Sequence, residues 1–218
     1  MTISEKVVDH AKETVFIVDD DPAICEGICN LLEAVGIAAR RYPSAEAFWD
    51  AREEARAGCL LLDARLPGMS GVEFQDRLQK AGICLPVIFM TAHGDVPMVR
   101  KVMKAGAVEF LTKPFQKEDL FHAIRQAFGF DRARREEEVV LNTIRARILS
   151  LTDREHIVME RITTGLLNKQ IAAELKLSEI TVKLHRRQVM EKMQARSFAD
   201  LVRMCERIKG AERNRPRA

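Results

Sequence analysis

The sequence has few cysteines and no long apolar run, and both shortages limit what the chain can be. Its five cysteines are an odd number without C-x-x-C spacing, which argues against a disulfide framework or a zinc site. Cys25 and Cys29 lie four residues apart on an expected helix, and we interpret them as small buried hydrophobes. No apolar run approaches the roughly 20 residues that span a bilayer, and the N-terminus lacks a secretory pattern. We therefore expect a cytoplasmic protein without a membrane partner.

The chain also lacks a strong net charge, because two opposite charges nearly cancel. A length of 218 residues fits two domains, and the net charge is +3. Residues 1–128 hold 15 basic and 19 acidic residues, a net charge of −4, whereas residues 129–218 hold 20 and 13, a net charge of +7. This asymmetry predicts that only the second half meets a polyanion.

The first half alternates short apolar runs with amphipathic segments. Strands are expected at 14–18, 37–40, 59–62, 85–90 and 107–111, each followed by a helix. This alternation predicts an α/β doubly wound parallel sheet of the flavodoxin-like class, with strand order 2-1-3-4-5. No G-x-G-x-x-G follows the first strand, which argues against a dinucleotide site.

Polar residues follow four of these strands. They are Asp19 and Asp20 after the first strand, Asp63 after the third, Thr91 after the fourth and Lys113 after the fifth. The carboxyl ends of parallel strands line one crevice, so these side chains are expected to converge. Clustered carboxylates repel one another and are tolerated mainly around a hard cation, for which Mg²⁺ (or Mn²⁺) is suited. A carboxylate nucleophile beside a cation, a lysine and a hydroxyl is equipped to accept a phosphoryl group.

On these residues and on the motif Lys113-Pro114-Phe115, residues 14–128 resemble the receiver domain of two-component response regulators. The resemblance implies that Asp63 is a phosphoacceptor served by a sensor histidine kinase. It implies a metal site made by Asp19, Asp20, Asp63 and the backbone carbonyl of Arg65. It also implies phosphate-binding and switch residues, which are Thr91, Ala92, Phe110 and Lys113, and a cis Lys-Pro bond. The segments 91–98 and 103–107 are similar to the FixJ branch in particular.

Residues 129–149 carry a charge run followed by apolar residues at helical spacing, without proline. We predict a helical linker that extends the preceding helix. Two interpretations remain open at this point. The linker pairs with another copy or packs on its own domains, or it is a solvated spacer.

Residues 150–210 contain capping signals for four helices. Thr152 and Glu155 form the S/T-x-x-E capping box, and Asn168, Ser178 and Ser197 are expected to cap the next three helices. The turn 176–178 separates the second helix from the third, which is the helix-turn-helix arrangement. We predict an all-α four-helix domain over 150–210, preceded by a receiver domain over 12–128 and followed by a disordered tail over 211–218.

The segments Leu151–Glu155, Asn168–Ala172 and Thr181–His185 resemble the LuxR-type DNA-binding domain. The resemblance implies base contacts from Lys183, Leu184 and Arg187. It implies mainly phosphate contacts from Lys169, Thr181 and Arg186. A stripe of residues on the last helix is implied as the dimer contact on DNA, although packing within the domain accounts for part of it: Phe198, Leu201, Val202, Cys205 and Ile208.

These features predict a response regulator transcription factor, not an enzyme, whose phosphorylation controls homodimerisation and binding to double-stranded DNA. We expect it to activate transcription, with RNA polymerase as a partner. A Mg²⁺-dependent phosphatase is disfavoured because Arg65 stands where such enzymes usually carry a second Asp. A phosphorylation-independent DNA-binding protein with a vestigial receiver remains the alternative, and a closed or extended inactive state is left open.

Overall fold

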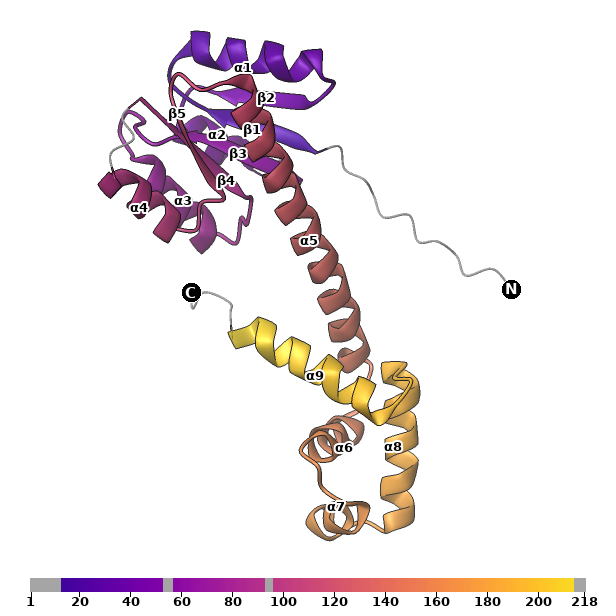
Figure 1. Cartoon of the computed structure of the whole chain (residues 1–218). Helices are drawn as coiled ribbons and strands as arrows, with labels where there is room; N and C mark the ends of the chain where they lie inside the picture. The colour runs from indigo at the N-terminus through magenta and orange to yellow at the C-terminus, as the bar shows by residue number, and fades with distance from the viewer. Residues whose placement is uncertain (1–12, 53–56, 93–95, 214–218) are drawn as a thin grey trace. The chain divides into compact units, whose positions relative to one another are not determined.

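The structure is a computed structural model that describes residues 13–52, 57–92 and 96–213 (Figure 1). The chain forms two compact units, divided between Arg134 and Arg135. The predictions for residues 12, 93–95 and 214–218 lie outside the described residues. Among the described helices, none is long and apolar enough to cross a membrane.

The first unit is built on a five-stranded parallel sheet with strand order β2-β1-β3-β4-β5. The strands are β1 (Thr14–Val18), β2 (Ala38–Tyr42), β3 (Gly58–Asp63), β4 (Val87–Thr91) and β5 (Glu109–Thr112). Every residue of the central strand β3 is buried, as expected for a strand covered on both faces. The predicted fold class and strand order are confirmed, and β2, β4 and β5 begin one or two residues later than predicted.

Helices cover both faces of this sheet. They are α1 (Pro22–Ala34), α2 (Ala45–Ala51), α3 (Gly71–Lys80), α4 (Val96–Lys104) and the first part of α5 (Lys117–Leu149). One core joins α1 and α5 to alternate strand residues such as Ile17 and Leu61. The other core joins α2, α3 and α4 to the intervening residues, such as Phe16 and Leu62. The period of two along each strand thus sends successive side chains into opposite cores.

A buried carboxylate ties α5 to the sheet. Asp131 is completely buried, and its Oδ2 accepts a hydrogen bond of 3.0 Å from the backbone N–H of Gly58, the first residue of β3. Its Oδ1 pairs with Arg134 at 2.7 Å. Gly58 has a φ of +133°, and a Cβ there would lie 1.8 Å from the carbonyl oxygen of Thr14, so only glycine fits. This link was not predicted from the sequence.

The second unit is all-helical. It contains the last part of α5 with α6 (Asp153–Thr163), α7 (Asn168–Leu175), α8 (Glu179–Met193) and α9 (Phe198–Arg213). From α5, Leu141, Ile144 and Ile148 join the core of this unit. Arg147 donates hydrogen bonds to the carbonyl of Met193 at 3.1 Å and to Gln194 Oε1 at 2.7 Å. The four-helix domain and the helical linker are confirmed, and the end of the linker packs on the helices that follow it.

Two helix boundaries differ from prediction. Asn168 is the first residue of α7 rather than its cap, because Leu167 is the N-cap and Gln170 Oε1 accepts from its N–H at 2.8 Å. The Asn168 side chain instead accepts a hydrogen bond from Arg186. Residues 211–213 of the predicted tail belong to α9.

We expect Asp131→Ala to destabilise the first unit by about 1–3 kcal/mol, because it leaves the buried Gly58 N–H without this acceptor. Urea unfolding followed by the fluorescence of Trp49, the single tryptophan, reports on this unit. Asp76→Ala is the matched control, since its ion pair with Lys80 is exposed and contributes at most about 1 kcal/mol. Equal transitions for the two variants would contradict a stabilising link.

Candidate functional site

The strand register brings the predicted site residues to one edge of the sheet. Asp63 is the last residue of β3, and Val18 pairs with Leu62, so Asp19 follows β1 beside Asp63. On the other side Asp63 pairs with Met90, which places Thr91 one residue further along β4. The backbone N–H of Lys113, just after β5, donates to the carbonyl of Thr91 at 2.7 Å. The carboxyl ends of these four strands therefore form one site.

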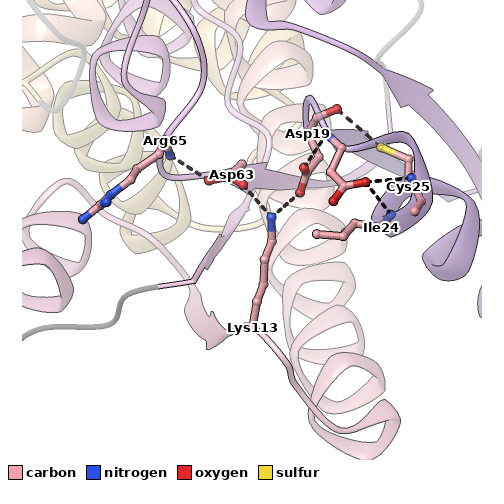
Figure 2. A network of polar contacts seen from close by, with 8 residues as sticks. Asp19, Ile24, Cys25, Asp63, Arg65 and Lys113 are labelled. Carbon is pink, nitrogen blue, oxygen red and sulfur yellow. Dashed lines mark hydrogen bonds and ion pairs between the residues drawn. The ribbon is translucent and has the colours of Figure 1, made fainter.

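A single ammonium group bridges the two buried carboxylates of the site. Lys113 Nζ lies 2.5 Å from Asp19 Oδ2 and 2.5 Å from Asp63 Oδ2. Figure 2 shows the Lys113 side chain pointing between the two carboxylates. The Asp19 side chain is completely buried, and those of Asp63 and Lys113 are only 12% and 13% exposed. This low exposure strengthens the attraction between the charges.

The pKa values reflect the balance between burial and pairing. Burial raises the pKa of Asp19, and hydrogen bonds from Lys113 and from the Asp21 N–H only partly offset that rise. For Lys113, burial acts to lower the pKa, but the hydrogen bonds to Asp19 and Asp63 outweigh it and the pKa is raised. Lys113 is therefore held in its charged form.

An acidic cluster occupies the same edge. Oxygen atoms of Asp19, Asp20 and Asp63 all lie within 4.8 Å of one another. Asp20 is exposed, so the cluster opens to solvent on one side. Among the residues that the structure describes, one ammonium group, that of Lys113, contacts this cluster, and such an oxygen-rich set of ligands suits a hard divalent cation that keeps part of its water shell. The residues present thus fit a divalent metal.

The other predicted residues surround this centre. The backbone N–H of Arg65 donates to Asp63 Oδ1 at 2.7 Å, and the Arg65 side chain is exposed (Figure 2). Thr91 is completely buried and Ala92 is exposed. Phe110 is half-buried and packs against the core that α2, α3 and α4 form with the sheet. The Lys113-Pro114 bond is cis, as the resemblance implied.

Cys25 contacts the backbone of Asp19, one member of the acidic cluster. Its thiol is buried and donates to the carbonyl oxygen of Asp19, with a distance of 3.5 Å (Figure 2). Burial raises the pKa of this thiol to about 11 and also raises that of Cys29. A high thiol pKa makes the thiolate scarce near neutral pH. The interpretation as a buried hydrophobe is confirmed for Cys25, whereas Cys29 is only partly buried.

The second unit carries the helix-turn-helix. Lys176 ends α7 in the left-handed conformation with a φ of 54°, and the Ser178 hydroxyl accepts from the Thr181 N–H at 3.1 Å to begin α8. Val182 and Val189 face the core of the unit. Of the predicted DNA contacts, Lys169, Lys183, Leu184 and Arg187 are exposed, and Thr181 and Arg186 are half-buried.

The predicted dimer stripe on α9 is largely internal. Leu201 is completely buried, Cys205 and Ile208 are each 7% exposed, and all three join the core of the second unit. Their prediction as dimer contacts is therefore corrected, because packing against α6 and α8 removes them from the surface. Phe198, at 43% exposed, and the half-buried Val202 are the members of the stripe that reach the surface.

Sequence reasoning missed three side-chain partners of the two arginines on α8. Arg187 Nε pairs with Glu191 Oε1 at 2.8 Å, which the i,i+4 spacing signals. Arg186 contacts Asn168 and the ring of Phe198. Because those two residues are 18 and 12 positions away from Arg186, no local spacing indicates these contacts.

Each of the two units matches a known family of protein domains. Residues 15–125 match the response regulator receiver domain, and residues 149–205 match the LuxR family of bacterial regulatory proteins. Nodulation protein W of Bradyrhizobium diazoefficiens is 44% identical over 90% of this chain and 87% of its own length. The transcriptional regulatory protein FixJ of Azorhizobium caulinodans is 41% identical over 88% and 90%.

Among solved structures, the response regulator StyR is similar, with a TM-score of 0.77 and 44% identity over 90% of this chain and 99% of that one. Family models and full-length relatives thus cover both units in the same order. The chain belongs to the response regulators that join a receiver domain to a LuxR-family DNA-binding domain.

Proposed function

We propose that Asp63 accepts a phosphoryl group from a partner sensor histidine kinase and that this controls DNA binding by the second domain. The observation that carries the proposal is the Lys113 ammonium group held between Asp19 and Asp63 at the open acidic cluster. In the transfer a carboxylate oxygen of Asp63 bonds to phosphorus. The phosphorus–nitrogen bond to the kinase histidine breaks, and its electron pair returns to the imidazole.

The surroundings of Asp63 favour one of its two carboxylate oxygens as the atom that is phosphorylated. Oδ1 accepts from the Arg65 N–H, and Oδ2 is held by Lys113. We assign phosphorylation to Oδ2, since the Lys113 ammonium group then lies beside the oxygens of the transferred group. Asp19, Asp20, Asp63 and the carbonyl of Arg65 would hold Mg²⁺ (or Mn²⁺), which neutralises charge on those oxygens when bound. Arg65 offers no second carboxylate for a phosphatase-type general acid.

The response to phosphorylation runs through residues next to the site. The Thr91 hydroxyl and the Ala92 N–H donate to the phosphoryl group, and Phe110 moves inward behind Thr91. Phe110 also lines a hollow of about 450 Å³ along β5 and the start of α5, whose other lining residues include Pro114 and Phe115. The movement reshapes the face made by α4, β5 and α5, and the phosphorylated chain forms a homodimer.

The homodimer binds double-stranded DNA at paired half-sites in the cytoplasm and activates transcription together with RNA polymerase. Lys183, Leu184 and Arg187 contact base edges in the major groove. Lys169, Thr181 and Arg186 contact phosphates. The receiver domain spans 12–128, the linker 129–149 and the DNA-binding domain 150–210.

Asp63→Asn tests the phosphoacceptor. We expect the wild type to gain one phosphoryl group per chain from acetyl phosphate and Mg²⁺ and to double its mass by light scattering. The variant should do neither, because an amide oxygen is a poor nucleophile. Asp76→Asn, on the exposed surface of α3, should behave as the wild type. Uptake by Asp63→Asn would contradict the assignment, and no uptake by the wild type would favour the vestigial receiver.

Lys183→Ala tests base reading by α8. On a duplex selected from a random pool by the phosphorylated wild type, we expect a loss of about 1–3 kcal/mol in binding free energy. On an unselected duplex the loss should be smaller, because base contacts add little to nonspecific binding. Lys209→Ala removes the same charge from an exposed position on α9 and is the control. Fluorescence anisotropy gives both affinities, and equal losses on the two duplexes would contradict base reading.

A further inference from the structure

Arg186 has an environment unlike that of the other cations on α7 and α8. One of its guanidinium N–H groups donates to Asn168 Oδ1 at 2.7 Å. Its central carbon lies 5.8 Å from the centre of the Phe198 ring, within the range of a cation–π contact. Asn168 is the first residue of α7 and Phe198 the first residue of α9. One side chain from the middle of α8 thus reaches the beginnings of two other helices.

Both partners of Arg186 are neutral. Arg187, the next residue, pairs with Glu191, so a carboxylate compensates its charge before any DNA arrives. In the described part of the chain no carboxylate lies within ion-pair distance of Arg186. A guanidinium group has five N–H donors. The cation–π contact with the ring of Phe198 does not use up one of these donors as a hydrogen bond would. The charge of Arg186 is therefore not paired with a carboxylate among the described residues, and most of its N–H donors stay available while its position is held.

We propose that Asn168 and Phe198 are positioning residues that hold the Arg186 guanidinium ready for a DNA phosphate. An arginine side chain that moves freely on the protein surface loses rotamer freedom when it binds a phosphate, and this loss of entropy weakens the contact. Asn168 and Phe198 impose that restriction in the free protein, so less is lost on binding. The proposal rests on the DNA-binding function above, and it gives Phe198 a task within its own domain that does not require a second copy.

The electrostatic prediction concerns Arg186 itself. On both the selected and the unselected duplex, Arg186→Ala should weaken binding by about tenfold. The slope of log affinity against log salt concentration should fall by about 0.9, as for one lost phosphate contact. Arg186→Lys keeps the charge but loses the planar group, so it should keep most of the slope and lose part of the affinity.

The positioning prediction uses pairs of variants. Phe198→Leu and Asn168→Ala should each weaken binding about threefold, whereas Phe198→Tyr keeps an aromatic face and should bind as the wild type. In the Arg186→Ala background, Phe198→Leu should weaken binding less than twofold, because the guanidinium group that Phe198 positions is already absent. Circular dichroism melting and sedimentation of each variant identify any loss of folding or of dimerisation.

Three results would overturn the proposal. An unchanged salt slope for Arg186→Ala would show that this residue contacts no phosphate. An effect of Phe198→Leu that is the same with and without Arg186 would show that Phe198 acts independently, as a dimer contact would. If the phosphorylated wild type bound neither duplex, the DNA-binding function itself would fail. With normal wild-type binding, the first result would also remove Arg186 from the phosphate contacts proposed above, whereas the second would overturn only the positioning role of Phe198.

Discussion

The receiver domain depends on one electrostatic constraint, the enclosure of two carboxylates with a single ammonium group. Asp19 and Asp63 lie at the ends of adjacent parallel strands, and burial raises the pKa of Asp19. Lys113 contacts both carboxylates and is held in its charged form, so a fixed positive charge lies beside the oxygens of the acidic cluster. Asp63 is the last residue of the central strand, and the Asp21 N–H donates to Asp19 Oδ1 at 3.0 Å, so backbone elements hold both carboxylates beside Lys113.

The helix α5 takes part in both units through different contacts. Its first part packs on the sheet, and the buried Asp131 on it accepts a hydrogen bond from the start of β3. Its last part places Ile144 in the helical core and Arg147 against the end of α8. The same helix is therefore fastened within each domain, at Asp131 in one and at Arg147 in the other. Residues Lys117–Leu149 thus form one helix that contributes side chains to the cores of both units.

In the DNA-binding domain, α8 is held in place by apolar contacts on one face and by polar contacts with neighbouring helices. The buried face of α8 supplies Val182, Val189 and Met193 to a core shared with α6 and α9. Polar contacts complete the attachment, since Glu155 in the capping box of α6 also pairs with Lys192 at 2.6 Å. Burial by these neighbours explains why most of the apolar stripe on α9 is internal. An amphipathic stripe identifies an apolar face but does not say which molecule covers it.

Local sequence patterns determined the fold class, the candidate site and most helix boundaries of this protein. An apolar run that ends in Asp63, carboxylates after another run, and Lys113 before a proline located the candidate site, because strand ends converge whenever parallel strands alternate with helices. Capping signals likewise located most helices to within a residue or two, since caps act over three or four positions. Contacts across long stretches of chain had no such signal. Asp131 meets Gly58 across 73 positions, and Arg186 meets Asn168 and Phe198 on other helices. Only tertiary packing brings such residues together, so only the folded structure decided which polar groups distant in sequence pair and which apolar faces are already covered.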